Sequence, residues 1–282
     1  MEKETGCSGM VDPAMLSRIQ AMRLMDDDFM TVVFSGDTAA TELLLRIILS
    51  RDDLRVKSSM TQKEKRNLFG RSVRLDIVAE DANGRKYNVE VQRAGKGAAA
   101  RRTRYNLALL DSHTLKKGED VSVLPETYII FITEHDYLGQ GKPCYKVRKV
   151  FEGTATGEIG DLPFDDGCSI IYVNGAYRGN DAIGRLMHDF NCVNADEMYY
   201  DELAERVRFH KQQEQGVKKV CRIVEEYGDE RAEEARKEVK KDFVEKLLRK
   251  NKLSVEEIAE VAELPLEQVR QMAEKLAEPV CG

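Results

Sequence analysis

The chain has 282 residues, of which 42% are hydrophobic and 33% charged, and its net charge is −6 at pH 7. This length can form one large domain or two, and the acidic balance argues against a generic polyanion binder. No apolar run approaches the roughly 20 residues that span a bilayer, and the first residues, MEKETGCSGM, lack the apolar stretch of a secretory signal. Six scattered cysteines without a Cys-X-X-Cys pair favour reduced thiols over disulfides or a zinc site. We therefore expect a cytoplasmic protein without a membrane segment.

Helices and strands are both predicted in the first half of the chain. In chain order, the pattern predicts a disordered tail over 1–14, a helix over 15–34, a helix capped by Asp37 over 38–50, a strand over 54–60, a polar connection over 62–71, a strand hairpin over 71–95, a helix over 97–116 and a strand over 126–135. Patterns of this kind indicate an α/β or α+β domain.

The hairpin over 71–95 carries an acid on each arm, Asp76 and Glu90, on either side of an Asn83-Gly84 turn signal. A two-residue loop would place the two acids on opposite faces of the hairpin, whereas a three-residue loop, 82–84, sets Asp76 directly across from Glu90. Side-chain alternation favours the second register, which also puts Gln92 on the same face. Two opposed carboxylates repel each other unless a positive charge lies between them, so we expect a divalent metal here.

The segments RLDI and NVEVQ, which carry Asp76 and Glu90, resemble the Asp…Glu-X-Lys signature of the PD-(D/E)XK nuclease superfamily. They are most similar to its Rpn-type recombination-promoting nucleases and transposases, in which Gln often takes the Lys position, as Gln92 does here. Asp28-Phe29 resembles the amino-terminal Asp…Phe element of that family, and TELLLRIIL resembles its first core helix. The resemblance covers about residues 20–140. It implies a restriction-endonuclease-like αβββαβ core, with a mixed central sheet flanked by helices.

The resemblance also implies a Mg²⁺- or Mn²⁺-dependent DNA endonuclease linked to recombination, transposition or defence. A hard divalent cation activates the attacking water and neutralises phosphate charge. Asp76, Glu90 and the Val91 backbone carbonyl are the predicted metal ligands. Asp28 is a further candidate ligand, beside its alternative as a helix cap or solvated acid. Gln92 cannot carry the charge of a Lys, but its amide can hold the attacking water or a phosphate oxygen.

A basic stretch without acids, RAGKGAAARRTR, begins directly after Gln92. Together with an Arg-X-X-X-Tyr spacing that resembles the family's, it predicts DNA contacts by Arg93, Lys96, Arg101, Arg102 and Tyr105. The alternative for the basic residues is an ordinary solvated helix face. The alternative for Tyr105 is packing against the sheet.

Beyond residue 137 the pattern predicts strands over 144–152 and 167–177 and helices from Asp181 onward. Sparse apolar positions over 201–250 are typical of a long solvated helix or arm. Residues 251–282 resemble a helix-turn-helix pair, with a capping box at Ser254-X-X-Glu257 and Pro265 at the start of the second helix. The expected parts are a tail (1–14), a nuclease-like domain (15–180), a helical arm (181–250) and this helix pair (251–282).

The carboxy-terminal helices are expected to support a homodimer. Two other functions stay open. One is a catalytically weak or inactive nuclease-fold module for binding or oligomerisation, which Gln92 and the net charge suggest. The other is a helix-turn-helix DNA-binding regulator, although the acidic second helix lacks the charge that offsets phosphates.

Overall fold

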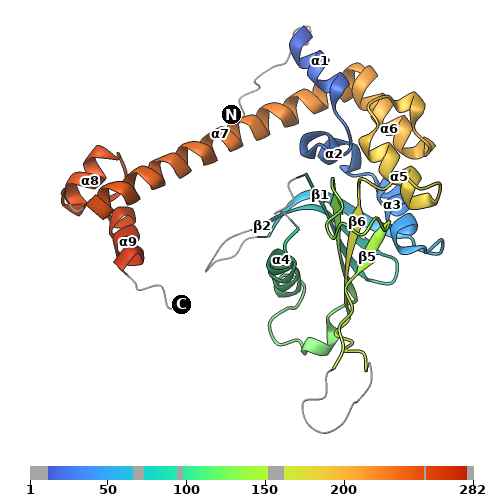
Figure 1. Ribbon diagram of the computed structural model, residues 1–282, viewed down its shortest axis with the longest axis horizontal. Coiled ribbons are helices and arrows are strands. Elements are labelled where there is room, and N and C mark those ends of the chain that lie inside the picture. The colour runs from blue at the N-terminus through green and yellow to red at the C-terminus, as the bar shows by residue number, and fades with distance from the viewer. Residues whose placement is uncertain (1–11, 66–72, 94–97, 152–161, 251, 278–282) are drawn as a thin grey trace. The chain divides into compact units, whose positions relative to one another are not determined.

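The computed structural model describes residues 12–65, 73–93, 98–151, 162–250 and 252–277. The chain forms two compact units, which divide after Ile223. The first unit contains a six-stranded mixed sheet flanked by helices, which confirms the predicted fold class (Figure 1). Within the described residues, no helix is long and apolar enough to cross a membrane.

The sheet has the strand order β1-β2-β3-β4-β6-β5. Its strands are β1 (Val56–Lys65), β2 (Val73–Asp81), β3 (Lys86–Gln92), β4 (Thr127–Thr133), β5 (Cys144–Lys146) and β6 (Cys168–Asn174). Strands β1, β2 and β3 are antiparallel neighbours, whereas β3, β4 and β6 run parallel and β5 is antiparallel to β6. The central strands β3 and β4 are buried along most of their length, as expected for strands that are covered on both faces.

The hairpin of β2 and β3 has the predicted register. Ile77 pairs with Val89, and the same register counted one residue further sets Asp76 opposite Glu90. The regular pairing ends at Ile77 and Val89, so the two acids lie just beyond the last paired residues. Because the side-chain period of a strand is two, this register keeps the two acids on one face.

The loop over 82–84 is held by Asp81. Its backbone N–H donates to the Arg85 carbonyl (3.1 Å), and its carboxylate accepts the N–H groups of Asn83 and Arg85, both at 2.9 Å. The Tyr87 hydroxyl donates to the same carboxylate at 2.8 Å. Gly84 has a φ of +80°, which glycine adopts without a steric penalty. These bonds fix the three-residue loop and with it the register.

Among the described residues, seven α-helices belong wholly or partly to the first unit. They are α1 (Pro13–Ala21), α2 (Asp27–Phe34), α3 (Thr38–Leu49), α4 (Ala100–Ser112), α5 (Ala182–Asn191), α6 (Asp201–Gln212) and the start of α7 (Glu214–Lys250). Helix α4 packs against β2 and β4 and therefore covers β3, which lies between them. Helices α2 and α3 pack against β1 and against α5 and α6, away from α4 (Figure 1).

The prediction of a single helix over 15–34 is wrong, because residues 22–26 are not helical and separate α1 from α2. Met22 is extended (ψ 149°), and the Asp26 carboxylate accepts the Arg23 N–H at 2.8 Å. The Met25 N–H donates to the Phe190 carbonyl at the end of α5 (3.0 Å). The break therefore depends on a contact with a distant segment. Helix α1 also begins at Pro13, inside the predicted tail.

Three predicted elements have other bounds in the structure. Strand β1 continues to Lys65, through the first part of the predicted polar connection, because it pairs with β2 along that length. Helix α4 ends at Ser112 rather than at residue 116. Of the strand predicted over 144–152, only 144–146 is regular, although Val150 forms an isolated bridge with Pro163. Residues 66–71 and 97 lie outside the described residues.

The second unit contains the end of α7 and the predicted helix pair, α8 (Val255–Val261) and α9 (Leu266–Ala277). The Ser254–Glu257 capping box is present. The pair is held by a small apolar core of Val244, Ile258, Ala259, Ala262 and Val269.

Candidate functional site

Asp76 of β2 and Glu90 of β3 meet in the interior of the first unit. The exposed fraction of Asp76 is 7% and that of Glu90 is 0%, so they are not ordinary surface acids. The Asp76 Oδ2 accepts the Val91 N–H at 2.9 Å, and its Oδ1 faces the Gln62 amide nitrogen at 3.5 Å. Helix α4 covers the strand that carries Glu90, which explains the burial.

The two carboxylate oxygens of Glu90 differ, because one is paired with a cation and the other has no hydrogen-bond partner among the described residues; we call the second the open oxygen. Its Oε2 accepts a hydrogen bond from the Arg102 guanidinium at 3.0 Å. Among the described residues, its Oε1 is buried without a hydrogen-bond partner. Arg102 also reaches the Gln92 Oε1 at 3.4 Å. A buried carboxylate oxygen without a donor is unusual, and a bound cation at this oxygen would account for it.

Both carboxyl groups hold protons more tightly than ordinary acids. Burial raises the pKa of Asp76 well above its usual value, and repulsion from Glu90 and Asp27 raises it further. Burial likewise raises the pKa of Glu90, while the positive charge of Arg102 opposes that rise. Two acids whose charged forms are disfavoured in one buried place are typical of functional sites.

The donor atoms of these residues suit a divalent cation. Two carboxylates and the Val91 backbone carbonyl are hard oxygen donors of the kind that Mg²⁺ and Mn²⁺ prefer, and the open Glu90 oxygen is available to one. Within the described part of the chain, no group of three or more His, Cys, Asp or Glu side chains could hold a metal ion. A Mg²⁺ site commonly keeps several waters, so two protein carboxylates are sufficient anchors.

Asp28, the further candidate ligand, is buried in the first turn of α2, with 6% exposure. It is neither the N-cap, which is Asp26, nor a solvated acid. Its carboxylate lies 3.8 Å from the Arg18 guanidinium. Thr31, one turn further along the same helix, reaches the site through Gln62.

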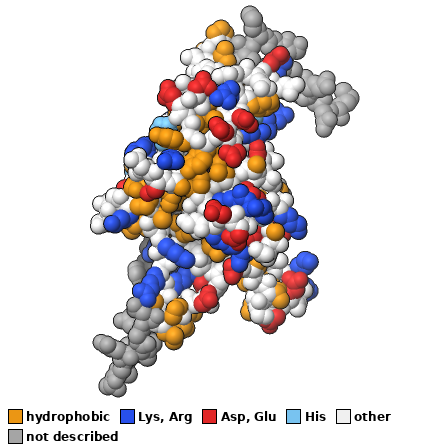
Figure 2. Space-filling view, turned by 90° about the vertical axis from the view of Figure 1, so that its right-hand side faces the viewer, with side chains coloured by type: hydrophobic (Ala, Val, Ile, Leu, Met, Phe, Trp, Pro, Cys, Tyr) orange, Lys and Arg blue, Asp and Glu red, His pale blue; other side chains and the backbone are white. Residues whose placement is uncertain are grey.

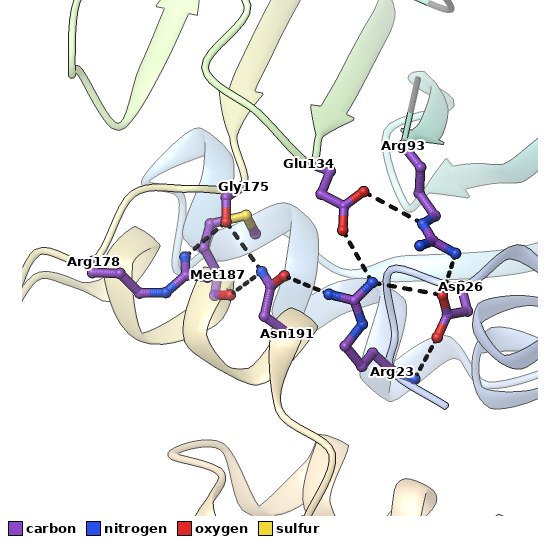
Figure 3. Close-up of polar contacts among 8 residues, drawn as sticks. All are labelled: Arg23, Asp26, Arg93, Glu134, Gly175, Arg178, Met187 and Asn191. Atoms are coloured by element: carbon purple, nitrogen blue, oxygen red, sulfur yellow. Dashed lines mark hydrogen bonds and ion pairs between the residues drawn. The ribbon is translucent and has the colours of Figure 1, made fainter. Parts of the chain in front are cut away.

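Arg93, a predicted DNA contact, is engaged in a polar network that joins four segments (Figure 3). Its guanidinium contacts Asp26 at 2.8 Å and Glu134 at 3.4 Å. Arg23 bonds the same Glu134 at 3.0 Å and reaches Asn191 of α5 at 3.4 Å. This network ties the ends of β3 and β4 to the connection between α1 and α2.

The other predicted DNA contacts differ in their surroundings. Arg101 is exposed on the first turn of α4, whereas the neighbouring Arg102 turns inward to Glu90. Tyr105 is half-buried, one helical turn beyond Arg101. Lys96 lies outside the described residues. The face seen in Figure 2 carries Lys and Arg next to Asp and Glu, so a basic surface on it is local rather than continuous.

Sequence reasoning missed Gln62 and Thr31. Gln62 lies opposite Asp76 only because β1 extends through the polar segment QKEK, which has no strand pattern of its own. Thr31 lies between Met30 and Val32 in the apolar part of α2, and nothing in the sequence pattern marks its hydroxyl as a site residue. Their contribution depends on tertiary pairing.

A family model described as PD-(D/E)XK nuclease family transposase matches residues 39–174. The match extends from α3 to the end of β6 and includes Asp76, Glu90 and Gln92. No match was found among curated proteins or among solved structures.

Proposed function

We propose, from the match of residues 39–174 to the family model described as PD-(D/E)XK nuclease family transposase, that the protein is a Mg²⁺-dependent DNA endonuclease. The reaction is hydrolysis of a phosphodiester bond, and Mn²⁺ is expected to replace Mg²⁺. Such an activity serves recombination, transposition or defence. The observation that carries the proposal is the buried pair of Asp76 and Glu90, which lies within the family match and has an open carboxylate oxygen.

Each residue of the site has a proposed task. Asp76, Glu90 and the Val91 carbonyl would hold the cation, and Asp28 would support them from α2. The cation would supply a water of lowered pKa and neutralise charge on the phosphate. Gln92 orients the attacking water through its amide, since an amide can donate and accept at the same time.

Arg102 supplies the positive charge that Gln92 lacks. Its guanidinium contacts both Glu90 and the Gln92 amide oxygen, so a cation from α4 lies where a Lys of the family signature would bring one from β3. With the site loaded, Arg102 is proposed to bind a phosphate oxygen, because a guanidinium matches phosphate geometry. Arg93, Lys96, Arg101 and Tyr105 are proposed to contact the DNA around it.

Plasmid nicking tests the proposal. Supercoiled plasmid is incubated with the full chain in Mg²⁺, Mn²⁺ or EDTA, and the conversion to open-circular and linear forms is followed on a gel. We expect Asp76→Asn and Glu90→Gln to lower the rate about a hundredfold or more. Each variant lacks a charged ligand for the cation, and the cation is what neutralises charge on the phosphate. Glu80 is a half-buried acid on β2, the strand of Asp76, so Glu80→Gln is the matched control. This variant should cut at the wild-type rate. Wild-type rates in both site variants would falsify the site.

A binding or assembly module is the second candidate. Gln92 is neutral, and Arg102 already balances the charge on one oxygen of Glu90. The folded chain therefore has a partner for Glu90 without a cation, as a protein that does not catalyse hydrolysis would need. Absence of cutting in every metal, combined with retained DNA binding in a gel shift, would favour this module over the nuclease.

The carboxy-terminal helices are proposed to dimerise the chain rather than to read DNA. On α7, Val239 and Phe243 lie one turn apart and are 70% and 44% exposed, which suits a helix–helix contact. Arg270 of α9 is paired with Glu256 of α8 at 3.2 Å, so its charge is less available to phosphates. Light scattering of wild type and Val239→Ser/Phe243→Ser tests the dimer.

A further inference from the structure

Gln62 adopts an unusual backbone conformation inside β1. Thr61 pairs with Ile77 and Lys63 with Leu75, so the register sets Gln62 opposite Asp76. Its φ is +50°, in the left-handed region where the Cβ of an ordinary residue crowds the backbone. The pairing keeps the same register on both sides, so this conformation does not mark the end of the strand. A strained residue in a continuous strand points to a task for its side chain.

The Gln62 side chain bridges α2 and the candidate site. Its amide nitrogen lies 3.1 Å from the hydroxyl of Thr31, which is 4% exposed, and 3.5 Å from the Asp76 Oδ1. The other oxygen of Asp76 accepts the Val91 N–H. Two neutral donors, one from β1 and one from β3, therefore hold the two oxygens of this carboxylate.

Other residues would occupy the position with less strain but could not make these contacts. Glycine adopts a positive φ freely and has no amide, and asparagine tolerates it better than most residues but is one methylene shorter. Only a side chain as long as glutamine carries an amide far enough from this strained backbone position to reach both Thr31 and Asp76. A Lys or Arg here would reach as far, but its charge would compete with a cation for Asp76.

We propose that Gln62 is a positioning residue that orients the Asp76 carboxylate for binding a divalent cation. This inference rests on the proposed function, because it assigns a residue to the same site. Neutral hydrogen bonds fix the orientation of a ligand without neutralising it, which is how residues behind a metal ligand tune affinity. Thr31 anchors the amide from the other side and so limits its rotation.

Direct Mn²⁺ binding to the full chain, followed by electron paramagnetic resonance, tests the role without depending on cutting. We expect Gln62→Gly and Gln62→Asn to weaken Mn²⁺ binding about tenfold. The melting temperature of Gln62→Gly should stay level or rise by up to about 2 °C, because glycine relieves the left-handed strain. A stability that holds while metal affinity falls distinguishes positioning from a merely structural role.

Ser50→Gly is the matched control. Ser50 has a φ of +53° at the C-cap of α3, so the substitution gives similar relief of strain away from the site and should leave Mn²⁺ affinity unchanged. Wild-type Mn²⁺ affinity in Gln62→Gly, whether or not its melting temperature falls, overturns the positioning role. If Asp76→Asn still abolishes binding in that case, the proposed function stands. A wild-type chain that binds no Mn²⁺ overturns both.

Discussion

Asp76→Asn should make the metal-free protein more stable, although it removes a predicted metal ligand. The substitution keeps the size of the side chain and an oxygen that can accept the Val91 N–H. It removes the negative charge beside Glu90, whose repulsion is one of the causes that raise the pKa of Asp76. Arg102 is paired with Glu90 and not with Asp76. Among the described residues, the direct hydrogen-bond donors to Asp76 are neutral, the Val91 N–H and the Gln62 amide, and the nearby charge of Arg102 offsets only part of the effect of burial and of repulsion by Glu90 on its pKa.

The pH dependence follows from proton linkage. A raised pKa means that the folded chain binds a proton at Asp76 more tightly than the unfolded chain. The stability from this group is therefore fully present below the unfolded pKa of about 4 and is lost as the pH rises through the folded value. Burying a polar or charged group without full compensation costs on the order of 1 to 3 kcal/mol. We expect the Asn variant to gain about this amount at pH 8, which is a rise in Tm of roughly 2 to 6 °C for a unit of this size, and to gain almost nothing at pH 4.

Differential scanning fluorimetry in EDTA, run for wild type and variant from pH 4 to pH 8, measures this difference. The matched control is Asp81→Asn, another buried acid of the hairpin. Its carboxylate accepts two backbone N–H groups and the Tyr87 hydroxyl, so its neutralisation should lower Tm at every pH. A gain in Asp76→Asn that does not change with pH would refute the reasoning, and so would a loss at pH 8. Added Mn²⁺ should raise the Tm of wild type and leave that of Asp76→Asn unchanged.

Three further predictions concern residues around the site and behind it. Arg102→Gln leaves Glu90 without its cation and should lower the unfolding free energy by about 2 kcal/mol at pH 8, whereas exposed Arg101→Gln should change it by less than about 0.5 kcal/mol; equal urea midpoints would contradict this. Burial lowers the pKa of His210 from 6.5 to about 4, so the stability that it contributes above pH 6.5 should be lost as the pH falls through 4. His210→Leu should remove this acid-side loss of about 3 kcal/mol in urea titrations. The Lys211 ammonium donates to three backbone carbonyls at 2.6–2.9 Å, near the end of α1 and after α5, so Lys211→Met should cost about 2 to 3 kcal/mol, and an unchanged urea midpoint would exclude this role.

The hairpin could be predicted from the sequence because its determinants are local. The side-chain alternation has a period of two, and Gly84 permits the positive φ of the loop. Together these choose one register and place Asp76 across from Glu90. The family resemblance rests on the segments that carry these two residues, and the family match covers them.

The parts that escaped prediction depend on contacts between distant segments. The break between α1 and α2 is held by the Met25 N–H on the Phe190 carbonyl, and no local pattern over residues 22–26 reveals it. The last part of β1 is polar and becomes a strand because β2 pairs with it. The inward turn of Arg102 toward Glu90 follows from the placement of α4 on the sheet. In each case tertiary contacts override local preference.

Buried acids elsewhere in the first unit show what this fold does when stability alone decides. Asp189, which is 0% exposed, accepts the backbone N–H groups of Tyr199 and Tyr200 at 2.9 to 3.1 Å, and Asp81 is supplied with donors in the same way. At the candidate site the opposite holds, because an acid with an open oxygen lies beside a second acid and a strained glutamine. Departures from the rules of folding that gather in one place are the mark of selection for chemistry. Substitutions that repair them should therefore raise stability and lower metal binding together.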